Sequence, residues 1–342
     1  MQTLTLTDDF IAGALSTERI GDALYPCRLP LSRRHFFPSP DDLLLRRARM
    51  TSGVRLRFES DARTLRLRFA PLPEPERDKT PRGHAFDLVL ENEIAQSRYC
   101  AGGAEEVVFD TGGARRRVVE IWLPPSAPVG LRALETDGER PPRPAPDPRP
   151  LWVTWGSSLT HCVRAGSAAR IWPGTVARRH NLNLMCLGFG GQCHLDPLVA
   201  LTIRDLPARY LSMKLGINAS SGSVNARTYP ALVAAAIQIV REGHPRTPLA
   251  MISPICCPHR ETTPNPVGYT LQAMRADMER VCRAFQDAGD LHLHYVNGLE
   301  LFGPDDIAHY AATDGLHPNA EGIDLQAERF SRLVMPRLLA DG

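Results

Sequence analysis

The sequence lacks any apolar run near the ~20 residues that a membrane-crossing helix needs. Residues 1–20 contain no basic stretch followed by an apolar one, so we predict no signal peptide, no membrane partner and a cytoplasmic location. The net charge is only +2 over 342 residues, which gives no electrostatic basis for binding nucleic acid. These absences leave the soluble globular proteins as the class to consider.

Cysteine pairs of the zinc-binding type are also absent. The eight cysteines are scattered without a C-x-x-C motif, and the adjacent Cys256 and Cys257 are poorly placed for a disulfide, so we expect reduced and mostly buried thiols. His292 and His294 lie two apart on one face of an expected strand, but no second ligand pair follows at metal-binding spacing. No resident metal or cofactor is predicted.

Residues 1–136 alternate apolar and polar residues with the period of a β-strand. The expected strands lie at Val54–Phe58, Leu65–Phe69, Phe86–Leu90, Val107–Phe109 and Val118–Leu123. Turn residues separate these runs, which predicts an antiparallel, jelly-roll-like β-sandwich. The arginines that alternate with apolar residues in the first two runs are expected on its solvated face, with an anionic-ligand site as the alternative; they are Arg55, Arg57, Arg66 and Arg68.

The proline-rich, polar block 137–150 predicts a semi-rigid linker between two domains. In residues 151–342, short apolar runs alternate with amphipathic helical stretches, which is typical of an α/β domain with a parallel sheet. Strands are expected at Leu151–Trp155, Leu182–Phe189, Tyr210–Leu215, Leu249–Ile255 and Leu291–Leu299. Helices are expected at Tyr229–Glu242, Thr270–Ala288 and Ala320–Leu339.

Ligands bind such sheets at the carboxyl ends of the strands, where four polar or glycine-rich segments are expected. They are Gly156-Ser157-Ser158-Leu159-Thr160, Gly188-Phe189-Gly190-Gly191, Gly216-Ile217-Asn218 and Asp314-Gly315-Leu316-His317. A serine hydroxyl needs a base to accept its proton, and that base needs an orienting carboxylate. Ser158, His317 and Asp314 can form this triad. The backbone N–H groups of Ser158 and Gly191 and the Asn218 amide can stabilise the developing oxyanion.

Any one of these segments alone is a weak signal. Taken in order, they resemble the four blocks of the SGNH (GDSL-like) hydrolase family over residues 151–340. The resemblance implies a flavodoxin-like three-layer α/β domain with Ser158, Asp314 and His317 as catalytic residues. Ser157 and Ala219 stand where the family usually has aspartates.

Several alternatives remain open at these positions. Ser157 is a rival nucleophile, and Gly188 or Gly190 can replace Gly191 as the oxyanion donor. The neighbouring His161 and Cys162 suggest a thiol nucleophile, although adjacent side chains rarely meet productively. The proline-rich segment 256–268 follows an expected strand at the catalytic edge, and we expect it to form a wall or lid of the acyl pocket.

The sandwich preceding an SGNH domain with a Gly-Ser-Ser nucleophile block is similar to acyltransferases of tetracycline-type antibiotic biosynthesis. This resemblance implies transfer of an acyl group, such as salicylyl or another aryl group, from an acyl-CoA co-substrate through acyl-Ser158 to a hydroxyl of a polyketide. The partners would then be a small-molecule acyl donor and a hydroxylated acceptor. The alternatives are an esterase or deacetylase acting on carbohydrate or small-molecule esters, and a non-catalytic binding protein. The sequence leaves the oligomeric state open.

Overall fold

The computed structural model describes residues 1–37, 41–113, 115–310 and 314–341. Contacts group the chain into two compact units. One consists of Met1–Arg149 with Val163–Cys186, and the other of Pro150–Cys162 with Leu187–Gly342. The sequence-based domain limits of 1–136 and 151–342 stay a prediction.

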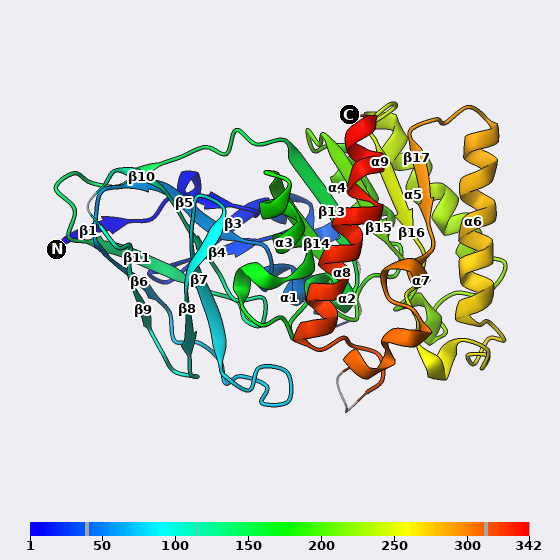
Figure 1. Ribbon diagram of the computed structural model, residues 1–342, viewed down its shortest axis with the longest axis horizontal. Coiled ribbons are helices and arrows are strands. Elements are labelled where there is room, and N and C mark those ends of the chain that lie inside the picture. Colours follow the sequence, from blue (N-terminus) through cyan, green and yellow to red (C-terminus); the bar gives the residue numbers. More distant parts are fainter. Residues whose placement is uncertain (38–40, 114, 311–313, 342) are drawn as a thin grey trace. The chain divides into compact units, whose positions relative to one another are not determined.

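The first unit contains two antiparallel six-stranded sheets (Figure 1). The first sheet has the order β3 (Ser16–Ile20), β4 (Ala23–Cys27), β11 (Leu131–Thr136), β6 (Thr64–Phe69) and β9 (Glu106–Asp110), with β1 (Gln2–Thr5) paired to β11. The second has the order β12 (Arg143–Pro144), β5 (Arg55–Ser60), β10 (Arg117–Trp122), β7 (His84–Leu90) and β8 (Glu93–Cys100), with β2 (Ile11–Ala12) paired to β5. Helices α1 (Leu43–Arg49) and α3 (Trp172–Arg179) also belong to this unit.

One apolar core joins the two sheets, as expected for a sandwich. Phe69 of β6 and Phe86 of β7 stack across it with ring centroids 5.0 Å apart. The five strands expected from alternation are all present within a few residues. Strand β8 was not predicted, because as an edge strand it buries little and shows no apolar alternation. It forms a hairpin with β7 through Glu91 and Asn92, both at positive φ, the backbone geometry that two-residue hairpin turns require.

The solvated-face prediction is wrong for Arg55 and Arg57. Arg55 is fully buried, and its Nη2 lies 2.8 Å from Asp147 Oδ2. Arg57 Nε lies 3.2 Å from Glu120 Oε1, and Arg149 pairs with both acids. Acidic residues distant in the sequence therefore neutralise these arginines, which alternation within one strand cannot reveal. Arg66 and Arg68 do lie on a solvent-facing surface, near Glu106 and Glu135.

This ion-pair cluster predicts a pH-dependent stability. Burial alone raises the pKa of Asp147, but the hydrogen bond from Arg149 and the charge of Arg55 outweigh it and hold that pKa at about 2, below 3.8. The stabilisation is therefore complete above the unfolded-state pKa and is lost as the pH falls from about 4 towards 2. We expect Asp147→Asn to lower the free energy of unfolding by about 2 kcal/mol at pH 6 and by less than about 1 kcal/mol near pH 2.

Urea denaturation of both proteins across this pH range measures the difference. Asp9→Asn, at an exposed aspartate, is the matched control and should match wild type throughout. If Asp147→Asn lowers the free energy of unfolding by the same amount at every pH, the ion-pair explanation is contradicted.

The third sheet has five strands in the order β14-β13-β15-β16-β17 (Figure 1). They are β13 (Leu151–Gly156), β14 (Asn183–Gly188), β15 (Tyr210–Lys214), β16 (Leu249–Ile252) and β17 (Leu293–Val296). The pairings from β13 through β17 are parallel, as the sequence predicted, and every residue of β15 and β16 is buried. This places the loops after these strands at one edge of the sheet.

Helices flank this sheet. They are α2 (Ser158–His161), α4 (Pro197–Arg204), α5 (Tyr229–Gly243), α6 (Leu271–Asp287), α7 (Gly298–Leu301), α8 (Ala320–Leu333) and α9 (Met335–Ala340). Phe330 of α8 packs on Trp152 of β13, and α6 lies beside β17 (Figure 1). Helix α8 begins at a side-chain cap, because Asn319 Oδ1 accepts a hydrogen bond from the Gly322 N–H at 2.9 Å. The three predicted helices are confirmed, although the last divides into α8 and α9 at Val334.

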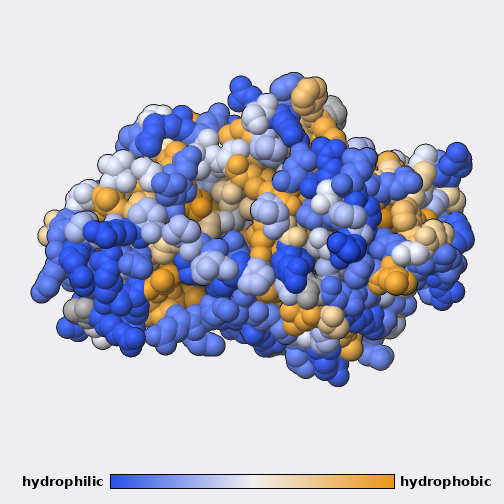
Figure 2. All heavy atoms as spheres, turned by 90° about the horizontal axis from the view of Figure 1, so that it is seen from above, coloured by the Kyte–Doolittle hydropathy of each residue, from blue (hydrophilic) through white to orange (hydrophobic). Residues whose placement is uncertain are grey.

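On the face shown in Figure 2, hydrophilic residues predominate and hydrophobic residues form smaller groups. Within the described ranges, none of the helices combines the length and the hydropathy that crossing a bilayer requires. All eight cysteines are buried thiols, as predicted.

Candidate active site

Ser158 lies in a tight turn between β13 and α2. The strand ends at Gly156, Ser157 is the N-cap, and Ser158 is the first residue of the helix. A Cβ atom at Gly156 would lie 2.2 Å from Thr160 Oγ1, so the turn can close only around a glycine. The turn leaves Ser158 half-buried.

Asp314 and His317 meet Ser158 from the loop before α8. His317 Nε2 lies 2.8 Å from Ser158 Oγ, and His317 Nδ1 lies 2.8 Å from Asp314 Oδ2. The imidazole therefore bridges the hydroxyl and the carboxylate through its two nitrogens. This is the geometry in which a histidine can accept the serine proton while a carboxylate orients the ring.

The Asp314 carboxylate serves both the turn and the histidine. Its Oδ1 accepts hydrogen bonds from the N–H groups of Leu316 at 3.0 Å and His317 at 2.9 Å, while Oδ2 faces the His317 ring. Partial burial raises the pKa of Asp314, but these hydrogen bonds outweigh it and hold the pKa below 3.8. The side chain is thus ionised near neutral pH, as a carboxylate that orients a catalytic histidine would have to be.

Asn218 follows β15, and one hydrogen bond defines the orientation of its side-chain amide. Its Oδ1 accepts a hydrogen bond from the Cys193 N–H at 3.0 Å. Because a backbone N–H can only donate, the amide orientation is settled, and Nδ2 is the end left to donate elsewhere.

Gly191 follows β14 at a φ of +72°, a backbone conformation that other residues rarely adopt. In the described part of the chain, no acceptor pairs with its N–H. The Gly190 N–H, in contrast, donates to His161 Nδ1 at 3.3 Å. Ser158 is the first residue of α2, so its own N–H has no acceptor within the helix. Three donors can therefore serve a negatively charged oxygen: Ser158 N–H, Gly191 N–H and Asn218 Nδ2.

A protein-family model that covers the C-terminal half of the chain agrees with the geometry of the candidate triad. The model of the GDSL-like lipase/acylhydrolase family matches residues 150–335, more than half of the chain. The chain belongs to this family. Residues 10–132 match a second model, described as the N-terminal domain of SsfX3. Membership supports an enzyme of the acyl-transfer and esterase class.

Solved structures of this GDSL-like fold extend the similarity over the whole chain. The salicylyl-acyltransferase SsfX3 from a tetracycline biosynthetic pathway is 27% identical, with a TM-score of 0.89 over 98% of this chain and 97% of that one. A GDSL-like-lipase homologue from Bacteroides ovatus is 16% identical, with a TM-score of 0.78 over 99% and 98%. A family two carbohydrate esterase from Cellvibrio japonicus is 14% identical, with a TM-score of 0.64 over 98% of each chain, and these last two share only the fold. No curated protein sequence matches the chain.

The alternatives within this GDSL-like site lie in less suitable positions. Ser157 is buried, and its Oγ accepts a hydrogen bond from the Leu159 N–H at 3.2 Å as the helix cap. Cys162 is buried, with its thiol towards the Leu159 carbonyl. His161 Nδ1 accepts a hydrogen bond from the Gly190 N–H. These contacts favour Ser158 as nucleophile and Gly191 as donor.

The two other histidines of interest lie elsewhere. His294 Nε2 lies 2.8 Å from Asp341 Oδ2, and His292 Nδ1 lies 3.8 Å from the same oxygen. Both histidines therefore face the Asp341 carboxylate, near the end of the described chain. They do not join the triad.

The segment 256–268 lies beside the catalytic loops, at the edge where we expected it. Cys257 Sγ lies 3.9 Å from the carbonyl oxygen of Gly315, within the Asp314–His317 turn. Arg260 donates to Ser220 Oγ at 3.1 Å, in the loop after Asn218. The segment thus contacts both the Asp314–His317 turn and the loop after Asn218, and its role as a wall or lid of the acyl pocket stays a prediction.

Sequence reasoning missed Lys214, one of only two lysines in the chain. Its ammonium is buried and donates to the Leu159 carbonyl at 3.0 Å and to Gln326 Oε1 at 2.9 Å. It therefore ties the nucleophile helix to β15 and α8. The sequence did contain a signal for this residue, because Lys214 is a lysine inside an apolar strand of a chain with only two lysines.

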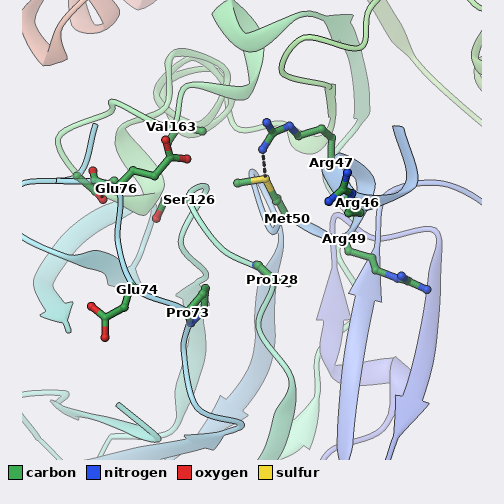
Figure 3. Close-up of a pocket in the computed structure, with 11 residues that line it drawn as sticks. Arg46, Arg47, Arg49, Met50, Pro73, Glu74, Glu76, Ser126, Pro128 and Val163 are labelled. Atoms are coloured by element: carbon green, nitrogen blue, oxygen red, sulfur yellow. Dashed lines mark hydrogen bonds between the residues drawn. The ribbon is translucent and has the colours of Figure 1, made fainter. Parts of the chain in front are cut away.

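A separate cavity of about 430 Å³ lies within the first unit and holds none of the predicted site residues. Figure 3 shows Arg46, Arg47 and Arg49 of α1 on one side of it and Glu74 and Glu76 on the other. Arg47 donates to the Met50 sulfur there at 3.4 Å. Opposite charges therefore face each other across this cavity, and its lining selects no single class of ligand.

Proposed function

We propose that this protein is a serine-dependent O-acyltransferase that moves an acyl group from a CoA thioester, through acyl-Ser158, to a hydroxyl of a natural product. An aryl group such as salicylyl and a tetracycline-type polyketide are the proposed donor group and acceptor class. Because acyl-CoA is an intracellular metabolite, the reaction is assigned to the cytoplasm.

One observation carries the choice of a transferase. Similarity to the salicylyl-acyltransferase extends over 98% of the chain, including the sandwich, at the highest identity among the three structures compared. A separate match of residues 10–132 to the N-terminal domain of that protein supports it.

In the first step, His317 Nε2 accepts the Ser158 proton while Oγ attacks the thioester carbonyl. The oxyanion that forms accepts hydrogen bonds from the donors at Ser158, Gly191 and Asn218. Collapse breaks the C–S bond, and the His317 proton leaves with the thiolate as CoA thiol.

In the second step, the acceptor hydroxyl gives its proton to His317 as its oxygen attacks the acyl-serine. The Oγ–C bond breaks, and the proton returns to Ser158. Asp314 keeps the ring oriented and stabilises its cation in both steps. The mechanism requires no resident metal or cofactor.

The second candidate is a hydrolase in which water takes the place of the acceptor. The full-length similarity to a family two carbohydrate esterase favours this reading. The same triad serves both reactions, so the fate of the acyl-enzyme must distinguish them.

Intact-protein mass spectrometry after incubation with a panel of aryl- and short-chain acyl-CoA thioesters tests the proposal. We expect a mass increase of one acyl group on the wild type, persistent without an acceptor, and none on Ser158→Ala. Rapid CoA release without an accumulated adduct would favour the hydrolase. A wild-type protein that leaves every thioester intact would contradict the proposed donor.

A further inference from the structure

The segment after β14 contains Gly191, a proposed oxyanion donor. Two histidines contact this segment: His161 binds the Gly190 N–H, and His194 binds the Gly191 carbonyl. His194 lies three residues beyond Gly191 and folds back onto it, with Nε2 3.1 Å from the Gly191 carbonyl oxygen. Since that oxygen can only accept, Nε2 carries the proton. The other ring nitrogen, Nδ1, lies 2.9 Å from Ser223 Oγ, in the loop that follows Asn218.

His194 therefore links the two loops that supply separate oxyanion donors. The Cys193 N–H, which donates to Asn218 Oδ1, adds a second link between the same loops. The Gln192 side chain also donates to the Gly191 carbonyl, at 2.9 Å, but it belongs to the adjacent residue. It cannot fix the position of Gly191 relative to the Asn218 loop.

The opposite end of the segment is held by His161. Its Nδ1 accepts the Gly190 N–H at 3.3 Å, and the imidazole is fully buried. A Cβ atom at Gly190 would lie 3.6 Å from Ser158 Cβ, so this residue lies directly against the nucleophile.

These two anchors flank the peptide that carries the donor. The Gly191 N–H belongs to the peptide between Gly190 and Gly191. His161 holds the peptide before it, through the Gly190 N–H, and His194 holds the peptide after it, through the Gly191 carbonyl. Two consecutive glycines have wide conformational freedom, so the direction of this N–H depends on contacts from outside the pair.

The backbone next to His194 is strained, which is consistent with a constrained loop. Leu195 adopts a φ of +64° and is buried, an unusual conformation for a bulky residue. Such conformations persist only where the surroundings impose them.

We propose that His194 is a positioning residue that fixes the Gly191 N–H in the oxyanion hole by tying the Gly191 carbonyl to Ser223. His161 supplies the fixed point at the other end of the segment. This inference rests on the proposed function, because it assigns Gly191 to oxyanion stabilisation.

A matched pair of variants tests it with 4-nitrophenyl acetate as substrate. Glutamine can place its Nε2 near the position of the histidine Nε2, whereas leucine fills the space without a donor. We expect His194→Leu to lower kcat by roughly 10- to 100-fold with little change in KM, because a misplaced donor weakens only the transition state. His194→Gln should retain at least about ten times the kcat of His194→Leu.

Ser223→Ala removes the other partner of the ring and keeps the test valid if His194→Leu fails to fold. It should also lower kcat without raising KM. Three results would overturn the inference. They are a wild-type kcat in both His194→Leu and Ser223→Ala, an equal fall of kcat in His194→Leu and His194→Gln, and a change of KM with kcat unaltered. Wild-type activity in Ser158→Ala would instead overturn the proposed function, and this inference with it.

Discussion

Replacing Ser158 with alanine is expected to lower kcat for an activated ester by roughly 10⁴-fold or more, leaving the fold intact. The Ser158 hydroxyl lies 2.8 Å from His317 Nε2, and no other hydroxyl is described at that nitrogen. Without Oγ no covalent intermediate can form. Only the weaker contribution of the oxyanion donors to direct attack by water remains. Hydrolysis of 4-nitrophenyl acetate, with thermal unfolding measured in parallel, gives both quantities.

Ser157→Ala is the matched control because it removes a neighbouring hydroxyl with a different role. Ser157 caps α2, and loss of such a cap lowers stability by about 1 kcal/mol. We therefore expect a small fall in Tm and a kcat at least about 100-fold above that of Ser158→Ala. A greater loss of activity in Ser157→Ala than in Ser158→Ala would identify Ser157 as the nucleophile.

Asp314→Asn is expected to lower kcat by about 10⁴-fold while changing stability little. The asparagine oxygen can still accept the Leu316 and His317 N–H groups that shape the turn. Its NH₂ group, however, faces His317 Nδ1 and favours the tautomer with the proton on Nε2. That tautomer cannot accept the Ser158 proton, so the base is lost although every side chain keeps its place.

Two variants distinguish this effect from a general loss of charge. Asp305→Asn changes an exposed aspartate in a neighbouring segment and should leave kcat unchanged. Asp314→Ala also removes the turn hydrogen bonds and should lower both kcat and Tm. Comparable activity in Asp314→Asn and wild type at pH 7 would exclude an orienting role for this carboxylate.

Short-range patterns explain why so much of the site could be predicted. The nucleophile turn and the Asp-x-x-His turn each place their functional atoms through contacts within a few residues, such as the Asp314 hydrogen bonds to Leu316 and His317. Strand alternation and buried apolar runs depend equally on local periodicity. The sandwich strands, the parallel sheet and the candidate triad therefore followed from the sequence.

The remaining features required the tertiary structure because their partners are distant in the chain. Arg55 is buried because Asp147, 92 residues later, neutralises it. His194 is indistinguishable from an ordinary loop residue until the fold brings Ser223 to it. Lys214 stands out in the sequence, but its contact with the Leu159 carbonyl appears only in the folded chain. The order of residues in the chain specifies the chemical groups and the order of the elements that carry them. Packing determines which charges are neutralised and which side chains contact the loops of the candidate site, because burial and long-range hydrogen bonds arise only when the chain is folded.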